Sequence, residues 1–252
     1  MNNWNLENKY ALVTGGSKGI GKAIVNEFLE LGASVFFLAR DEKQTEAALA
    51  SFGESRIKAM AGDVTDAGFR KKVRHWINEN WGALDILVNN AGINIRKPSG
   101  EYTAEEYRRV LDINLIAPFE FSRELFPLLN NSNGAAIVNV SSVAGAMDAK
   151  TGAPYGMSKS GLLQLSRSLA AEWAPHNIRV NTVSPWFTET PATSKMLADP
   201  EKRSHIISRT PLKRIGKDRE IAAAVAFLCM DKASYITGQN IFVDGGATTS
   251  IL

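Results

Sequence analysis

Thr14-Gly15-Gly16-Ser17-Lys18-Gly19-Ile20-Gly21 is the stretch that decides the fold, because it directly follows the short apolar run 10–14. That run has the composition of a buried strand, and the residues after the stretch have helical spacing. Glycines at 15, 19 and 21 permit a sharp turn and let a phosphate approach without a Cβ in the way. The following helix would direct its free N–H groups and positive dipole end at that phosphate. The stretch therefore predicts a phosphate-binding turn, with a plain glycine-rich turn as the alternative.

A P-loop is a second alternative, since Gly16, Gly21 and Lys22 match its first seven positions. The eighth position of a P-loop must be Ser or Thr to hold magnesium, and here it is Ala23. The P-loop interpretation therefore fails. The spacing G-x-x-x-G-x-G also differs from the G-x-G-x-x-G of the general dinucleotide fingerprint.

Outward from this turn, short apolar runs alternate with longer helical patterns almost to the end of the chain. The expected strands are 10–14, 34–39, 57–61, 86–89, 136–140, 179–183 and 240–243, and the expected helices are 21–31, 44–51, 67–81, 104–129, 155–173 and 219–230. Such alternation predicts right-handed crossovers and a parallel sheet with helices on both faces. We therefore expect residues 1–252 to form a single α/β domain, a Rossmann fold with a doubly wound seven-stranded parallel sheet.

Residues 186–216 depart from this alternation. The segment is long, lacks an obvious strand and carries Pro191, Pro200 and Pro211. A long irregular segment inside a compact domain is often a lid over a site. We therefore expect a substrate lid at about 186–216.

The composition is that of an ordinary soluble globular protein, with 44% hydrophobic and 22% charged residues. The formal net charge is +3, and no run of five or six like charges suggests a nucleic-acid partner. The only cysteine, Cys229, cannot form an internal disulfide, which fits a reducing compartment. The N-terminus lacks the apolar stretch of a signal peptide, and no apolar run is long enough to cross a membrane. We expect a cytoplasmic protein.

The end of the second expected strand bears on the choice of dinucleotide. Such folds place a carboxylate there for the free ribose 2′-hydroxyl of NAD, and a basic residue for the 2′-phosphate of NADP. Here Ala39 and Arg40 close the strand, Asp41 comes one position too late, and Lys18 in the glycine turn could approach the same phosphate. This favours NADP(H), the alternative being two solvated surface cations.

Tyr155 and Lys159 lie four residues apart and therefore on one face of an expected helix. Free tyrosine has a pKa near 10 and is a poor base at neutral pH, whereas a nearby ammonium favours the phenolate. The spacing alone is common by chance. However, Ser142 follows the strand 136–140, at the edge of the sheet where ligands bind. Asn114 lies inside the expected helix 104–129, where asparagine is a mediocre choice.

These motifs, with Asn89-Asn90-Ala91-Gly92 and Val243-Asp244-Gly245-Gly246, occur in the order and spacing of the short-chain dehydrogenase/reductase family, which the whole chain resembles. Within the family the chain is most similar to the tropinone reductases. Three stretches carry that closer likeness: Trp4-Asn5-Leu6, Glu172-Trp173-Ala174 with Asn177-Ile178-Arg179-Val180-Asn181, and Ala233-Ser234-Tyr235-Ile236-Thr237-Gly238-Gln239. The resemblance implies an oxidoreductase that interconverts a ketone and a secondary alcohol with NADP(H).

The resemblance also implies roles for four catalytic residues. Tyr155 would protonate the carbonyl oxygen or deprotonate the alcohol, and Ser142 would hydrogen-bond that oxygen. Lys159 would hold the nicotinamide ribose and lower the pKa of the tyrosine, and Asn114 would anchor a water that relays protons to Lys159. The family's usual Pro-Gly after the sixth strand is replaced by Pro185-Trp186, a pair that recurs among tropinone-reductase-like members.

The residues expected around the cofactor and the substrate follow from the same likeness. Expected cofactor contacts are Gly15, Ser17, Lys18, Gly19, Ile20, Gly21, Arg40, Asp63, Val64, Asn90, Ala91, Gly92, Tyr155, Lys159, Pro185, Thr188 and Thr190. The expected substrate pocket is Ser142, Tyr155, Trp186, Phe187, Met196 and Leu197, and its apolar members suit a cyclic or bulky ketone. No metal is expected, because His75, His176 and His205 are dispersed.

Other functions within the fold stay open at this point. A 3-oxoacyl-carrier-protein reductase and a sugar-alcohol dehydrogenase are the alternatives within the family, and a non-catalytic dinucleotide sensor is the alternative outside enzymes. The resemblance further implies a homodimer or homotetramer that pairs through the helices 104–129 and 155–173, and often again around the last helix and strand.

Overall fold

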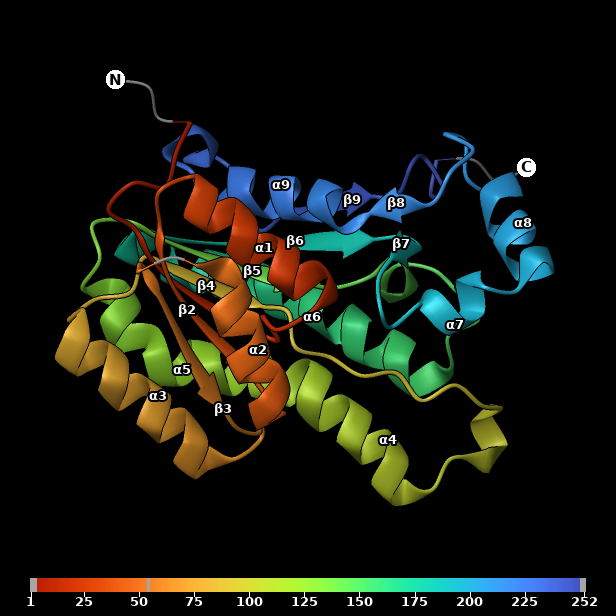
Figure 1. The fold of residues 1–252 in the computed structure, drawn as a ribbon, viewed down its shortest axis with the longest axis horizontal. Helices are drawn as coiled ribbons and strands as arrows, with labels where there is room; N and C mark the ends of the chain where they lie inside the picture. The colour runs from red at the N-terminus through yellow and green to blue at the C-terminus, as the bar shows by residue number, and fades with distance from the viewer. Residues whose placement is uncertain (1–3, 54, 250–252) are drawn as a thin grey trace.

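The computed structural model describes residues 4–53 and 55–249. Its main sheet has seven parallel strands in the order β3-β2-β1-β4-β5-β6-β9 (Figure 1). The strands are β1 Tyr10–Thr14, β2 Ser34–Ala39, β3 Ile57–Ala61, β4 Ile86–Asn89, β5 Ala135–Val140, β6 Ile178–Pro185 and β9 Asn240–Val243. The predicted doubly wound seven-stranded Rossmann sheet is confirmed. The strand order reverses between β1 and β4, and ligands bind at such a switch point.

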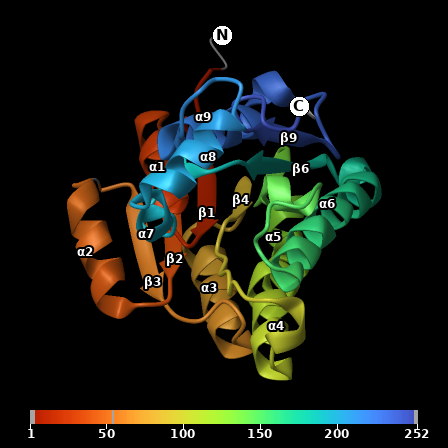
Figure 2. The same cartoon turned by 90° about the vertical axis from the view of Figure 1, so that its right-hand side faces the viewer.

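Helices cover both faces of the sheet (Figure 2). One face is covered by α1 Gly19–Glu30, α2 Glu42–Phe52 and α9 Asp218–Cys229, and the other by α3 Ala67–Asn80, α5 Ala117–Asn130 and α6 Ala153–Trp173. Alternate residues of β1 serve the two cores: Val13 packs in the first, whereas Leu12 packs in the second. Burial on both faces explains why the strands are continuous apolar runs. Single-turn 3-10 helices lie at Ser99–Glu101, Val143–Gly145, Ala174–His176 and Asp231–Ala233.

The helix expected over 104–129 is interrupted, so that expectation was wrong at its centre. The structure has α4 at Ala104–Leu111, a π-helical turn at Asp112–Ile116 and then α5. An uninterrupted α-helix needs the N–H of residue 118 to bond the carbonyl of residue 114, and Pro118 has none. The widened turn accommodates this missing donor and holds Asn114.

The segment 186–216 is more regular than expected. It contains α7 Ser194–Leu197 and α8 Pro200–Ser208, and its β7 Thr188–Glu189 pairs with β8 Gly216–Lys217 in a separate two-stranded sheet. The expectation of a strandless, irregular segment was therefore wrong. Leu197, Ile206 and Ile215 form a small apolar cluster of its own. Figure 1 shows this segment at the right, beyond the end of β6.

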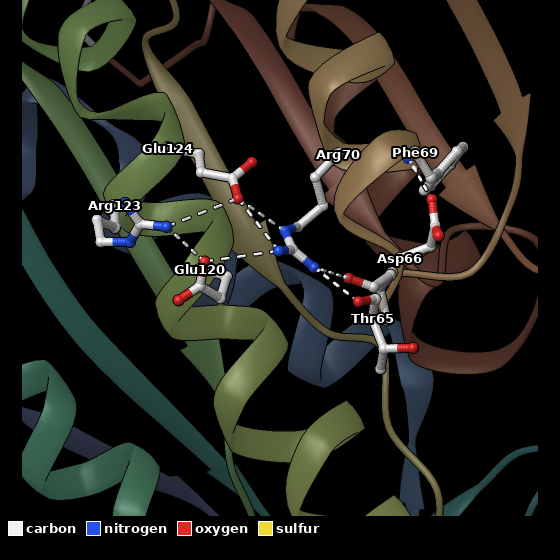
Figure 3. A network of polar contacts seen from close by, with 8 residues as sticks. Thr65, Asp66, Phe69, Arg70, Glu120, Arg123 and Glu124 are labelled. Carbon is white, nitrogen blue, oxygen red and sulfur yellow. Dashed lines mark hydrogen bonds and ion pairs between the residues drawn. The ribbon is translucent and has the colours of Figure 1, made fainter.

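A buried ion-pair network joins α3 to α5 beside the sheet (Figure 3). Arg70 of α3 is 6% exposed and lies 3.1 Å from Glu124 and 3.5 Å from Glu120 of α5. Its guanidinium also donates to the backbone carbonyls of Val64 and Thr65, at 3.2 Å and 2.9 Å. The network therefore ties the loop after β3 to the helix layer.

Among residues 4–53 and 55–249, no helix combines the length and the apolar character that a membrane span requires.

Candidate active site

A cavity of about 820 Å³ opens at the carboxyl ends of β1, β2, β4, β5 and β6. Ser142 and Trp186 line this cavity. It is also lined by all seventeen residues expected to contact the cofactor, namely Gly15, Ser17, Lys18, Gly19, Ile20, Gly21, Arg40, Asp63, Val64, Asn90, Ala91, Gly92, Tyr155, Lys159, Pro185, Thr188 and Thr190. The fold thus brings together residues up to 175 positions apart in the chain, from Gly15 to Thr190 (190 − 15).

The glycine turn is held in shape by Asn90. The Nδ2 group of Asn90 donates to the carbonyls of Thr14 and Gly15, at 2.9 Å and 3.2 Å. A Cβ at Gly21 would lie 2.0 Å from the carbonyl oxygen of Gly15, and Gly15 itself has a φ of +71°. Both positions therefore require glycine, and the backbone stays open toward the cavity.

The N-terminus of α1 faces the cavity without a side-chain cap. Lys18 occupies the N-cap position in an extended conformation and makes no capping hydrogen bond. The next three residues, Gly19 to Gly21, are the first of the helix and line the cavity. The N–H groups at a helix start have no intrahelical partner, and they bind phosphate oxygens well. These residues fit the diphosphate of a dinucleotide.

At the end of β2 the cation Arg40 lines the cavity, whereas the carboxylate of Asp41 is engaged at the start of α2. Asp41 caps α2, where its Oδ1 accepts from the N–H of Gln44 at 2.8 Å. Arg40 is exposed and lines the cavity, and it makes no hydrogen bond or ion pair within the described chain. Partial burial raises the pKa of Asp63, but hydrogen bonds from Thr65 and the charges of Arg40 and Arg109 bring it below its ordinary value. The guanidinium of Arg40 therefore lies near the cavity wall that Asp63 forms.

Tyr155 and Lys159 stand on the first turns of α6, which begins at Ala153 with Pro154 in its first turn. The Nζ of Lys159 lies 5.7 Å from the centroid of the Tyr155 ring and donates to the carbonyl of Val140 at 2.8 Å. Lys159 is only 4% exposed, and this burial lowers its pKa to about 8.

The pKa of Tyr155 departs from the expectation that Lys159 would lower it. Burial raises the pKa of the phenol, while the Ser142 hydroxyl and the charge of Arg96 act in the opposite direction without reversing the shift. The physical reason is desolvation, which penalises the phenolate more than the neighbouring groups stabilise it. The phenol of Tyr155 therefore keeps its proton at neutral pH.

Asn114 lies behind the cavity and not in its lining. Its Oδ1 accepts from the N–H of Ile93 at 2.8 Å, and its Nδ2 donates to the carbonyl of Ile93 at 2.9 Å and to the hydroxyl of Ser158 at 3.1 Å. The side chain is fully buried. It therefore fixes the segment after Gly92 against α6, and its role in anchoring a water stays a prediction.

The expected substrate residues divide into two groups. Ser142 and Trp186 line the cavity with Tyr155, whereas Phe187, Met196 and Leu197 are not among its lining residues. Leu197 belongs to the apolar cluster inside 186–216, and Phe187 and Met196 pack against it. These three side chains therefore pack within the segment 186–216 and do not line the cavity. The local sequence does not reveal this packing.

Comparison with known proteins identifies the family. A family model described as enoyl-(acyl carrier protein) reductase matches residues 15–248. A tropinone reductase homolog of Arabidopsis thaliana is 47% identical over 251 residues, which cover 98% of this chain and 93% of the relative. The chain belongs to the short-chain dehydrogenase/reductase family. Senescence-associated protein 13 of the same plant is 43% identical over 250 residues, 98% of this chain and 93% of that protein.

Solved structures of short-chain dehydrogenases/reductases share the fold over almost the whole chain. The Pseudomonas aeruginosa RhlG/NADP active-site complex is 33% identical, with a TM-score of 0.92 over 98% of this chain and 99% of that one. A gluconate 5-dehydrogenase from Burkholderia cenocepacia J2315, in complex with NADP and tartrate, is 27% identical with a TM-score of 0.93 over 99% of both chains. The chain is an oxidoreductase of a family that uses a nicotinamide dinucleotide and acts on small molecules.

Several lining residues were not expected from the sequence. Ile93 and Asn94 extend the wall beyond Asn90-Ala91-Gly92, and Gln44 and Thr193 line it from α2 and from the segment 186–216. Their nearness to the family motifs was the available signal for Ile93 and Asn94. Gln44 and Thr193 carry no such signal, because only the tertiary arrangement brings them to the cavity.

Proposed function

We propose that this protein is an NADP(H)-dependent, tropinone-reductase-like oxidoreductase that interconverts a ketone and a secondary alcohol, with Tyr155 as general acid and base. One observation carries the proposal: a single cavity is lined both by the uncapped N-terminus of α1 and by Ser142, Tyr155 and Lys159. A dinucleotide whose diphosphate lies at α1 can therefore extend toward the catalytic side chains without leaving the cavity.

The residues of the chain divide the chemistry between them. The bound nicotinamide supplies or accepts the hydride. In reduction, Tyr155 donates its phenolic proton to the carbonyl oxygen, which also accepts a hydrogen bond from Ser142. The raised pKa of Tyr155 keeps this proton in place at neutral pH, which suits reduction, whereas oxidation requires the phenolate and is favoured as pH rises. Lys159, cationic below its pKa of about 8, donates hydrogen bonds to the nicotinamide ribose.

The charges around the end of β2 support NADP(H) over NAD(H). Arg40 is an exposed, unpaired cation at the end of β2 within the described chain, and Lys18 is a second exposed cation in the glycine turn. The nearby carboxylate of Asp41 already caps α2. In addition, two solved relatives are NADP complexes.

The alternatives within the family are a 3-oxoacyl-carrier-protein reductase and a sugar-alcohol dehydrogenase. The decisive experiment follows NADPH absorbance with purified protein and three substrate classes: cyclic ketones, 3-oxoacyl thioesters and keto-sugars. Turnover of cyclic ketones above the other two classes supports the proposal. Binding of NADPH without turnover of any class would instead indicate a dinucleotide sensor.

We also propose a homo-oligomer in the cytoplasm. Exposed apolar side chains lie on α5 and α6, at Phe119 and Met157, and on β9 at Ile241 and Phe242. These are the elements through which the family resemblance predicts pairing. The proposed location rests on Cys229, a free and buried cysteine that fits a reducing compartment, and cell fractionation tests it directly.

A further inference from the structure

Arg96 lies on the segment that follows β4, beside the cavity. Ile93 and Asn94 of this segment line the cavity, and two residues later the Nη1 of Arg96 lies 3.0 Å from the Sδ of Met196 on α7. Thr193, three residues before Met196, also lines the cavity. Arg96 and Met196 are not lining residues themselves, and their contact joins the β4 loop to the segment 186–216 next to the cavity.

The backbone on both sides of Arg96 is held in place. The Tyr102 hydroxyl donates to the carbonyl of Ile95 at 2.5 Å. Lys97 pairs with Glu106 at 2.5 Å and lies 5.5 Å from the centroid of the Tyr102 ring. Because its neighbours are fixed, Arg96 loses less conformational freedom when it binds a ligand.

The charge of Arg96 is not neutralised within the described chain. Within the described chain its guanidinium contacts a thioether sulfur, which is only a weak acceptor, whereas the neighbouring cation Lys97 has Glu106 as its partner. Its field also reaches the catalytic hydroxyl, since it opposes the burial that raises the pKa of Tyr155. A guanidinium without a carboxylate partner therefore lies beside the cavity, close enough to act on Tyr155.

Carboxylates are confined to the other end of the cavity. Among the described lining residues, the acidic ones are Asp41 and Asp63, which lie beside Arg40 at the ends of β2 and β3. An ammonium group on a substrate would thus lack a counter-ion near Tyr155, whereas a carboxylate would have one.

We propose that Arg96 binds a carboxylate of the substrate, so that the protein selects anionic ketones and alcohols and disfavours cationic amino-ketones. A guanidinium binds a carboxylate through two charge-assisted hydrogen bonds in a fixed fork, which would orient the substrate as well as hold it. The inference rests on the proposed ketone–alcohol activity, and it narrows the substrate to one charge class.

A set of three ketones of similar shape tests the inference. The probes are 4-oxocyclohexanecarboxylate, its neutral carboxamide and 4-(aminomethyl)cyclohexanone, which are anionic, neutral and cationic at pH 7. Wild type should give kcat/KM in the order anion, neutral, cation. Arg96→Gln should lower the value for the anion roughly 5- to 30-fold and leave the neutral ketone within about twofold, the loss expected for one partly solvated charge-assisted contact.

Two further variants distinguish a direct contact between Arg96 and the substrate carboxylate from a general effect of the protein's positive charge. Arg96→Lys keeps the charge without the fork and should restore part of the preference for the anion. Lys72→Gln removes an exposed cation from α3, away from the cavity, and should change none of the three values beyond about twofold. Equal losses in Arg96→Gln and Lys72→Gln, or a wild-type preference for the neutral or cationic ketone, would overturn the inference.

A binding measurement keeps this inference distinct from the proposed function. Calorimetry of 4-hydroxycyclohexanecarboxylate, with and without NADP⁺, needs no turnover. If no ketone is reduced, the proposed function fails, and binding by wild type that Arg96→Gln loses still supports the role of Arg96. If both proteins bind the alcohol equally, or neither binds it, Arg96 does not select the anion, whatever the activity.

Discussion

Among single residues, Tyr155 is the one to which the proposed mechanism assigns proton transfer. Its hydroxyl is the proposed acid, and its ring is half-buried on the first turn of α6. Tyr155→Phe removes the proton donor and keeps the ring, so turnover should fall about 10²–10⁴-fold while NADPH binding is largely retained. Steady-state kinetics and fluorescence titration with NADPH measure the two effects. Near wild-type turnover in this variant would contradict the mechanism.

Arg40 is the single residue expected to set the preference between NADPH and NADH. Arg40→Ala should weaken NADPH roughly 10- to 150-fold and leave NADH almost unchanged, because one charge-assisted contact with the 2′-phosphate is lost. Lys18→Ala should act in the same direction but less strongly, since a lysine makes a point-charge contact without a fork. The measurement is the ratio of kcat/KM for the two cofactors at fixed salt. A wild-type preference for NADH, or a ratio unchanged within about twofold in Arg40→Ala, would leave Arg40 as a solvated surface residue.

At the scale of elements, the Arg70 network couples two helices to the cofactor cavity. Arg70 joins α3 to α5, and it holds the carbonyls of Val64 and Thr65 while Val64 lines the cavity. Glu124 has one buried oxygen, Oε2, without a partner within the described chain. Its other oxygen lies 3.1 Å from Arg70, which therefore compensates the negative charge of this carboxylate. Figure 3 shows Arg70 between the two glutamates and the loop.

Arg70→Met should therefore destabilise the protein strongly. Removing one partner of a buried ion pair leaves uncompensated charge and costs about 3–5 kcal/mol in the free energy of unfolding. Urea unfolding measures this loss. Arg123→Ala is the control, because Arg123 contacts the same glutamates from an exposed position and should cost far less. Adding Glu124→Gln to Arg70→Met should recover part of the loss, and equal losses in Arg70→Met and Arg123→Ala would contradict this account.

Elements also show how far the sequence predicts this molecule. The strands agree to within a residue or two at nearly every end, because apolar runs between helical segments leave a local pattern. The π-helical turn at 112–116 leaves no such local pattern in the sequence, apart from Pro118 and an asparagine, Asn114, inside an expected helix. The Arg70 pairs join residues 50 and 54 positions apart, so no local window contains them. That the expected cofactor residues line one cavity could be predicted from motifs, whereas the positions of Phe187, Met196 and Leu197 depend on packing inside 186–216.

At the scale of the whole molecule, exposed apolar side chains lie on or next to the elements through which the proposed oligomer would pair. Ile116 at the end of the π-helical turn, Phe119 on α5 and Met157 on α6 are 47%, 39% and 58% exposed, and Ile241 and Phe242 on β9 are each 37% exposed. Contiguous exposed apolar area marks interaction sites more often than single residues do. Two self-complementary interfaces on one chain generate a tetramer with two kinds of contact.

Phe119→Glu should therefore break one of the two interfaces and leave the other. A carboxylate buried at an apolar interface loses its hydration, and this desolvation opposes association. Light scattering should then show wild type at a multiple of the 27.4 kDa chain mass and Phe119→Glu at half the mass of a wild-type tetramer, or at monomer mass if wild type is a dimer. Lys72→Glu adds the same charge on α3, which carries none of these apolar side chains, and should keep the wild-type mass. A wild-type monomer at micromolar concentration, or an unchanged mass in Phe119→Glu, would show that α5 does not form the interface.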